Sequence, residues 1–132
     1  MAQSSTSLSR FLGAGLVAGF ASVVVNAAIY LLASVSGAWD LSVISPAGSP
    51  ITVVPVIILS LAPAVLGALL AGILMRRSAQ GRAWFLGIAF VVLVFMAFPP
   101  LGLGAPFVMM LLLQLQHVVV AAFTLWFVLR VA

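Results

Sequence analysis

Residues 107–129 read FVMMLLLQLQHVVVAAFTLWFVL, an apolar run without Asp, Glu, Lys or Arg that holds two glutamines and the chain's one histidine. A hydrocarbon core about 30 Å thick is crossed by roughly 20 apolar helical residues. The run therefore predicts a membrane-spanning helix. The polar side chains inside it need partners within the protein, because lipid offers no hydrogen bonds.

Three similar segments precede this one, each bounded by arginine, glycine or proline. The chain is 66% hydrophobic and only 5% charged, whereas a soluble domain of this size needs several times more charge to cover its surface. We predict an all-α integral membrane bundle of four transmembrane helices, which forms one domain over residues 11–132 after a disordered cytoplasmic N-terminus at 1–10. The predicted spans are 11–36, 51–75, 83–98 and 107–129.

The first span is predicted to be an uncleaved anchor and not a signal peptide. Its apolar stretch is about twice as long as a signal peptide's hydrophobic region, and Asn26 lies within it.

The basic residues all fall on one side of a bundle with four spans, and the single acid, Asp40, falls on the other. By the positive-inside rule both termini and the 76–82 loop are cytoplasmic, while the 37–50 and 99–106 loops face outward. The tryptophans fit this orientation, with Trp39 near the outer interface and the other two near the cytoplasmic one. The arginines are Arg10, Arg76, Arg77, Arg82 and Arg130, and the cytoplasmic tryptophans are Trp84 and Trp126.

Small and polar residues recur at helical spacing and predict which faces pack, because helices in lipid associate through close approach and interhelical hydrogen bonds. We interpret the GxxxG at Gly15 and Gly19 as packing within one subunit in preference to a dimer seam. Pro63 cannot donate to the carbonyl of Leu59, so we expect a local bend there. The predicted faces are Gly15, Gly19, Ser22, Asn26, Tyr30 and Ala33 in the first span; Ser60, Pro63, Gly67 and Ala71 in the second; and Gln114, His117, Ala121 and Thr124 in the fourth.

Several polar side chains share one depth. Asn26, Ser60 and His117 each lie about nine or ten residues from the outer end of their span, which at about 1.5 Å per residue agrees within one turn. With Tyr30 and Gln114 one turn nearer the outside, they form a candidate intramembrane polar site. Gln116 is about 100° from His117 around the helix, so we expect it to face a different neighbour or a subunit contact.

Two interpretations of His117 are open. In the favoured one a neutral His117 hydrogen-bonds Asn26, directly or through one water, or Ser60, and joins two helices. In the other, His117 lines a pocket, where it could take up a proton, bind a polar head group or ligate a metal. The third span has no polar side chain at this depth, so we expect it to be either the lipid-facing member or merely an apolar one.

The sequence lacks the residues that several other kinds of site require. The chain has no cysteine, which excludes disulfides and thiolate metal sites, and no carboxylate stands in any span to carry protons. Haem would need a histidine from a second chain or one of Met96, Met109 and Met110, which nothing in the sequence favours. We expect no metal and no cofactor. The arginines sit at segment ends and not on one exposed face, so we expect no nucleic-acid partner.

The order and spacing of several motifs resemble a known family. Asn26 with Tyr30 and Gly37, the segment VVPVIILSLAPAVLGALLAG at 53–72, the Arg76–Arg77 loop, FPPL at 98–101 and QHVVVAA at 116–122 are similar to the bacterial, mainly actinobacterial, four-helix membrane family known as domain of unknown function 6069. The likeness covers nearly all of the chain after residue 10. It implies the fold with four spans and emphasises Asn26, Pro63 and His117, but it implies no activity, substrate or cofactor.

These observations favour a non-enzymatic, multi-pass protein of the bacterial plasma membrane that acts as an accessory or lipid-interacting component. The alternative is a small binding or transport protein with its site at Asn26, Ser60 and His117. An enzyme is the third hypothesis, because no nucleophile with a base, paired carboxylates or phosphate loop is present. The expected partners are membrane lipid and either a second copy of the chain or another membrane protein.

The orientation can be tested with a reporter that is active only in the cytoplasm. Fused to Ala132, it should be active, because the one-sided arginines hold both termini inside. The same reporter inserted beside Asp40 is the control and should be silent. A stable fusion that is silent at Ala132 and active beside Asp40 would reverse the topology.

Overall fold

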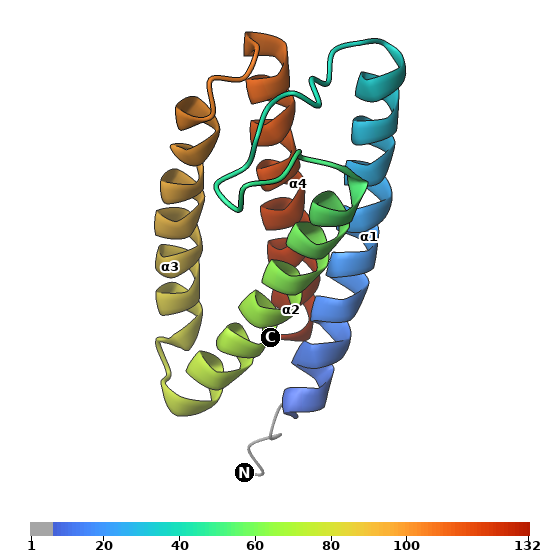
Figure 1. Cartoon of the computed structure of the whole chain (residues 1–132). Helices are drawn as coiled ribbons and strands as arrows, with labels where there is room; N and C mark the ends of the chain where they lie inside the picture. The colour runs from blue at the N-terminus through green and yellow to red at the C-terminus, as the bar shows by residue number, and fades with distance from the viewer. Residues whose placement is uncertain (1–6) are drawn as a thin grey trace.

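A computed structural model describes residues 7–132 of the chain as antiparallel helices joined by short connections (Figure 1). The predicted fold class is confirmed: the described residues are helical, without a strand beyond an isolated bridge between Ile44 and Pro50, and four segments are long and apolar enough to cross a membrane. The helices are α1 (Leu8–Val35), α2 (Val53–Arg77), α3 (Gly81–Met96), the short 3-10 helix η1 (Pro99–Gly102) and α4 (Phe107–Val131).

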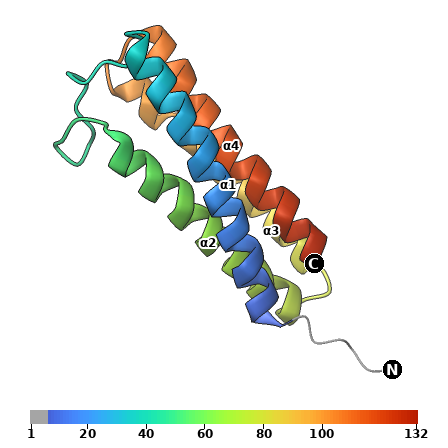
Figure 2. The same ribbon diagram turned by 90° about the vertical axis from the view of Figure 1, so that its right-hand side faces the viewer.

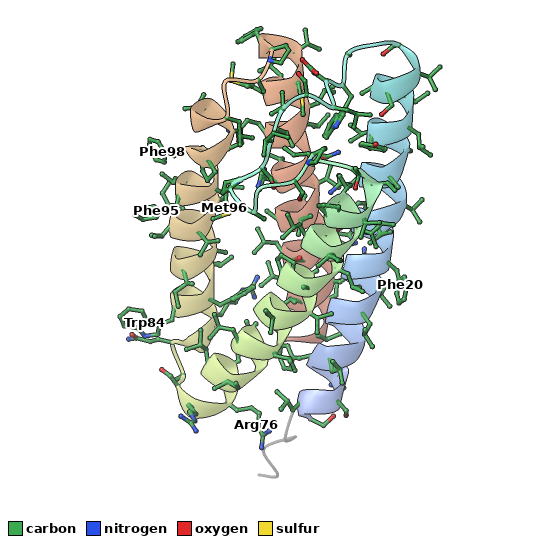
Figure 3. The ribbon with its side chains drawn as sticks, in the orientation of Figure 1. Phe20, Arg76, Trp84, Phe95, Met96 and Phe98 are labelled. Carbon is green, nitrogen blue, oxygen red and sulfur yellow. The ribbon has the colours of Figure 1, made fainter. Side chains whose placement is uncertain are left out.

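The first helix begins earlier than predicted. Residues 1–6 lie outside the described residues, but α1 already begins at Leu8, so residues 8–10 are helical. Arg10 is therefore in the first turn of α1, at the same end of the bundle as the C-terminal turns of α2 and α4 with Arg76, Arg77 and Arg130. Arg76 marks this end in Figure 3.

Charged and aromatic groups mark the two ends of the bundle. Trp84 and Trp126 are exposed at the arginine end, where the guanidinium of Arg130 lies 4.3 Å from the ring centre of Trp126. Asp40 lies at the opposite end, where hydrogen bonds from the hydroxyl and the backbone N–H of Ser42 lower the pKa of its carboxyl. The surface between the ends exposes large apolar side chains such as Phe20 (Figure 3), as lipid contact requires.

The most extensive helix contact joins α1 and α2. A Cβ placed on Gly15 would lie 2.7 Å from the Cβ of Ala68, and one on Gly19 would lie 2.6 Å from Cδ1 of Leu61. The missing side chains thus let the two backbones approach. All six residues of the predicted α1 face are buried, together with Phe11, Ala14 and Ala18.

The packing face of α2 differs from the predicted one. Pro63 is exposed and Gly67 is half-buried, because the buried residues of α2 run along a line rotated away from them. That line consists of Val56, Ser60, Ala64, Ala68, Ala71 and Gly72. The prediction relied on proline and glycine, which are unusual in a helix. The contact with α1 is instead formed by residues such as Ala64 and Ala68, which are four residues apart.

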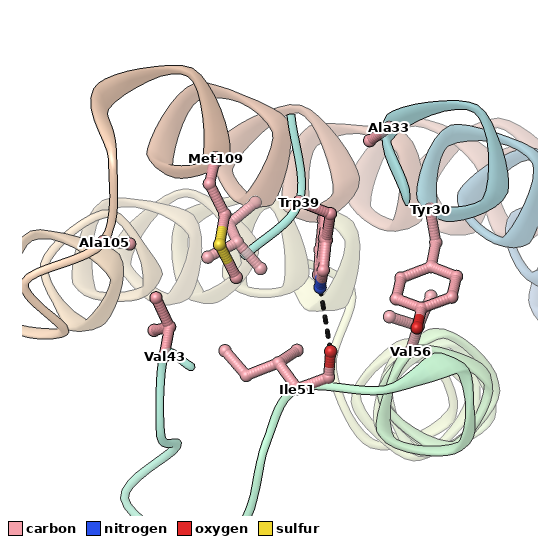
Figure 4. Close-up of a cluster of buried hydrophobic side chains, with 9 residues drawn as sticks. Tyr30, Ala33, Trp39, Val43, Ile51, Val56, Ala105 and Met109 are labelled. Carbon is pink, nitrogen blue, oxygen red and sulfur yellow. Dashed lines mark hydrogen bonds between the residues drawn. The ribbon is translucent and has the colours of Figure 1, made fainter. Parts of the chain in front are cut away.

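The loop between α1 and α2 is held by Trp39, which is buried and not exposed as an interfacial tryptophan. Its Nε1 donates to the carbonyl of Ile51 at 2.8 Å, and its ring meets Tyr30 edge-on at 5.0 Å (Figure 4). Gly37 has φ +76, the left-handed conformation that ends many helices. An apolar cluster forms around this tryptophan from Tyr30, Ala33, Trp39, Val43, Ile51, Val56, Ala105, Met109 and Leu113.

Helix α3 is attached mainly at its ends. α1 packs against α2 and α4 (Figure 2), whereas α3 contacts α2 and α4 and lies on the opposite side of the bundle from α1 (Figure 1). Within α3 only Gly81 and Phe85 are buried, both near the arginine end, where Gly81 presses against the backbone of Leu74. At the other end Nε2 of Gln114 donates to the carbonyl of Ala97. The middle of α3 therefore stands apart, as expected for a lipid-facing helix.

The close contact of α1 with α2 predicts a stability effect with a built-in control. Gly15→Leu and Gly19→Leu should each lower the melting temperature in detergent by several degrees, because overpacking costs about 1–3 kcal/mol. Gly13→Leu should melt like the wild type, because a Cβ on Gly13 meets nothing within 4 Å. Equal melting of all three variants would contradict this packing.

Candidate functional site: an intramembrane polar cavity

A buried amide joins three helices in the middle of the bundle. Nδ2 of Asn26, on α1, donates to Oγ of Ser60 on α2 at 2.9 Å and to the backbone carbonyl of Gln116 on α4 at 3.2 Å. In turn, Nε2 of Gln116 donates to the backbone carbonyl of Asn26 at 3.3 Å. The side chain of Asn26 is 1% exposed, so these bonds replace the water that hydrocarbon cannot supply.

The orientation of the Asn26 amide follows from its partners. The carbonyl of Gln116 can only accept, so the group facing it must be the NH₂ and not the oxygen. Oδ1 of Asn26 then points elsewhere, and it has no hydrogen-bond partner within residues 7–132. Oγ1 of Thr124, about two turns after Gln116 on α4, is the other buried side-chain atom without a hydrogen-bond partner. Such groups are rare in folded proteins and call for an explanation.

The expected direct hydrogen bond between His117 and Asn26 is wrong. Nδ1 of His117 pairs with the carbonyl of Leu113, four residues earlier on the same helix, at 2.7 Å. Gln116, which was expected to face a different neighbour, faces Asn26 instead. The depth was therefore predicted correctly, but α4 is rotated so that the residue before the histidine meets α1.

The other two members of the predicted site lie elsewhere. Tyr30 belongs to the apolar cluster around Trp39, and Gln114 binds the end of α3. Asn26, Ser60 and His117 remain together because all three line one cavity. Gln116 and Thr124 complete its polar wall, and neither was included in the predicted site, although Thr124 belonged to the predicted α4 face.

The cavity lies between α2, α3 and α4 and has a volume of about 440 Å³, within the range of small-molecule sites. Apart from the polar wall its lining is apolar. It reaches from Phe85 near the arginine end to Met96 and Pro99 near the other, which is roughly 16 Å along α3 at about 1.5 Å per residue. The apolar lining includes Ile51, Val56, Leu59, Pro63, Leu70, Ile88, Val92, Leu93, Val120, Ala121 and Leu125.

The cavity opens between α2 and α3. Its lining residues on α4 are buried or half-buried, so α4 forms the back wall. On α2 and α3, by contrast, Leu59 is 66% exposed and Val92 is 51% exposed. Figure 1 shows these two helices diverging from their shared connection at the arginine end, with α4 behind them. The opening thus lies on the apolar flank of the bundle and not at its polar ends.

The wall of the cavity holds hydrogen-bonding groups but no charge. The chain's one acid and five arginines all lie outside the lining. Residues 7–132 contain no group of three or more His, Cys, Asp or Glu that could hold a metal ion. The arrangement can therefore bind an apolar chain with a small polar group.

The Asn26 junction predicts which pairs of residues are energetically coupled. Asn26→Ala and Ser60→Ala should each lower stability, and the double variant should lose less than their sum by about 0.6–2 kcal/mol, because they share a hydrogen bond. Asn26→Ala and His117→Ala form the matched control and should add within about 0.5 kcal/mol. Chemical or thermal unfolding in detergent measures both cycles. Coupling to His117 without coupling to Ser60 would contradict the observed junction.

Comparison with known proteins places the chain in a family. No curated protein and no solved structure matches it. The family of unknown function DUF6069 matches residues 6–132, nearly the whole chain, in agreement with the resemblance seen in the motifs. The protein is thus a member of the DUF6069 family, with four helices apolar enough to span a membrane.

Proposed function

We propose that the protein is a non-enzymatic, lipid-interacting component of the bacterial plasma membrane that binds a lipid-like molecule in the cavity between α2, α3 and α4. The observation that carries this proposal is an apolar cavity of about 440 Å³ touching His117 and opening on the flank of the bundle. A dry, closely packed histidine would instead have favoured a purely structural role.

The position of the opening supports a ligand that arrives from the bilayer. The exposed lining residues Leu59, Val92 and Met96 are apolar, so an aqueous solute would have to cross hydrocarbon to reach them. A lipid chain needs no desolvation there, since its surroundings in the bilayer are equally apolar. The polar wall at Asn26, Ser60 and His117 can then distinguish a molecule with a polar group from a plain acyl chain.

The attachment of α3 supports exchange of such a ligand. Its middle is not packed against α1, and it is fixed near Gly81 and Ala97. A small outward shift between these two attachments widens the opening without breaking the Asn26 junction, which involves only α1, α2 and α4. The proposed orientation, with the arginine end in the cytoplasm, puts the end of the cavity at Met96 and Pro99 in the outer half of the bilayer.

Photolabelling with a hydrocarbon probe tests this proposal. The protein is reconstituted in phosphatidylcholine vesicles with an alkane that carries a diazirine, irradiated and digested, and the adducts are located by mass spectrometry. We expect adducts on lining residues such as Leu59 and Val92. Ala121→Trp should reduce them severalfold, because the indole occupies the cavity.

Ala122→Trp provides the matched control. Ala122 is the next residue on α4, and it is exposed and does not line the cavity, so its substitution should leave the labelling of Leu59 and Val92 unchanged. Labelling that is equally strong in both variants, or spread evenly over exposed residues such as Val24, would show that the cavity holds no ligand.

A further inference from the structure

We propose that the ligand of this cavity is a neutral molecule with a long hydrocarbon chain and a hydrogen-bond donor at its head, that is, a long-chain alcohol or a neutral glyceride with a free hydroxyl. This inference rests on the proposed function and adds the chemical class of the ligand. Its basis is the kind of hydrogen-bonding group that the cavity wall leaves without a partner.

His117 contributes an acceptor. The carbonyl of Leu113 has no proton to give, so the 2.7 Å contact with Nδ1 of His117 requires a proton on Nδ1. In the neutral imidazole the proton-free Nε2 is then an acceptor. The contact with Leu113 thus sets both the tautomer and the role of the free ring nitrogen.

Two buried oxygens add to this capacity: the amide oxygen of Asn26 can only accept, and the hydroxyl of Thr124 can accept as well as donate. Asn26 and Thr124 both line the cavity, are more than nine-tenths buried, and hold side-chain oxygens without partners. Both donor positions of Asn26 are used by Ser60 and Gln116, so only acceptor capacity is left. Pro63 adds the carbonyl of Leu59, which has no N–H to receive four residues later. A hydroxyl proton in the cavity would satisfy one of these acceptors.

The charges of the chain exclude an ionic head group. A cationic ligand would need a carboxylate, and the only one, Asp40, lies in the loop between α1 and α2 and outside the cavity lining. An anionic ligand would need a cation. All five arginines lie at the ends of the helices, and the neutral His117 described above carries no charge. A buried charge without a partner is costly in hydrocarbon. A neutral donor avoids this cost.

Competition against the photoreactive alkane tests the head group. In phosphatidylcholine vesicles, whose lipid has no hydrogen-bond donor, dodecanol should suppress the labelling of Leu59 and Val92 at about 3- to 10-fold lower mole fraction than dodecyl methyl ether, as expected for one net hydrogen bond. Dodecanoate and dodecylammonium should compete less well than the ether. Dioleoylglycerol is the second arm: competition by it as well as by dodecanol indicates a glyceride, and competition by dodecanol alone indicates a single-chain alcohol.

Variants of the acceptors tie the preference to the wall. His117→Phe and Thr124→Val keep the shape of each side chain and remove an acceptor, so the preference for the alcohol over the ether should shrink. Ser22→Ala is the control, because Ser22 is buried but bonds Ala18 and does not line the cavity. Should the substituted proteins fail to fold, the comparison of alcohol with ether in the wild type still decides the matter.

Two results would overturn the inference, and each differs from a failure of the proposed function. Equal competition by alcohol and ether, with labelling still sensitive to Ala121→Trp, would leave lipid binding intact and remove the role of a donor. Stronger competition by either ion would contradict a neutral ligand. Labelling that does not depend on Ala121 with any probe would refute ligand binding itself.

Discussion

The hydrogen bonds of Asn26 are the interaction on which the rest of the structure depends. An amide buried at mid-depth in an apolar bundle must find its partners within the protein, and Asn26 finds one on α2 and another on α4. Those bonds define the relative height of three helices. Gly15 and Gly19, which precede Asn26 on α1, then allow α1 to approach α2, while apolar clusters close the bundle around Trp39 at one end and Phe11 at the other.

Helix α3 is outside this arrangement, and the cavity follows from that. α3 has no polar side chain in its middle and no contact with α1, so nothing in the junction draws it inward. Its attachments lie near its two ends, at Gly81 and through Gln114 to Ala97. A bundle of four helices with only three joined at mid-depth encloses space beside the junction, and it places the unpaired oxygens of Asn26 and Thr124 next to that space.

Much of the fold could be predicted from the sequence because membrane crossing depends on length and apolarity, both of which are local properties. The buried face of α1 was also predictable, since its small residues recur at helical spacing.

Counting residues from the membrane surface correctly put Asn26 and Ser60 at one depth. Counting does not determine rotation about the helix axis, and neighbours such as Gln116 and His117 point about 100° apart, so the partner of Asn26 was assigned to the wrong one of the two. Trp39 likewise has the right height for an interfacial residue, but the structure shows it buried and hydrogen-bonded to Ile51. The cavity was not predictable, because the apolar sequence of α3 is compatible with contact to lipid, to protein or to a ligand.

A crystal structure grown from a lipidic mesophase would test the central claim most directly, namely that α1, α2 and α4 are joined through Asn26 while α3 leaves a cavity for a lipid-like ligand. The account predicts Nδ2 of Asn26 within hydrogen-bonding distance of both Ser60 and Gln116, with elongated density between α2 and α3 that ends near His117. A structure in which α3 packs along its whole length against α2 and α4, so that their own side chains fill this volume, would contradict it.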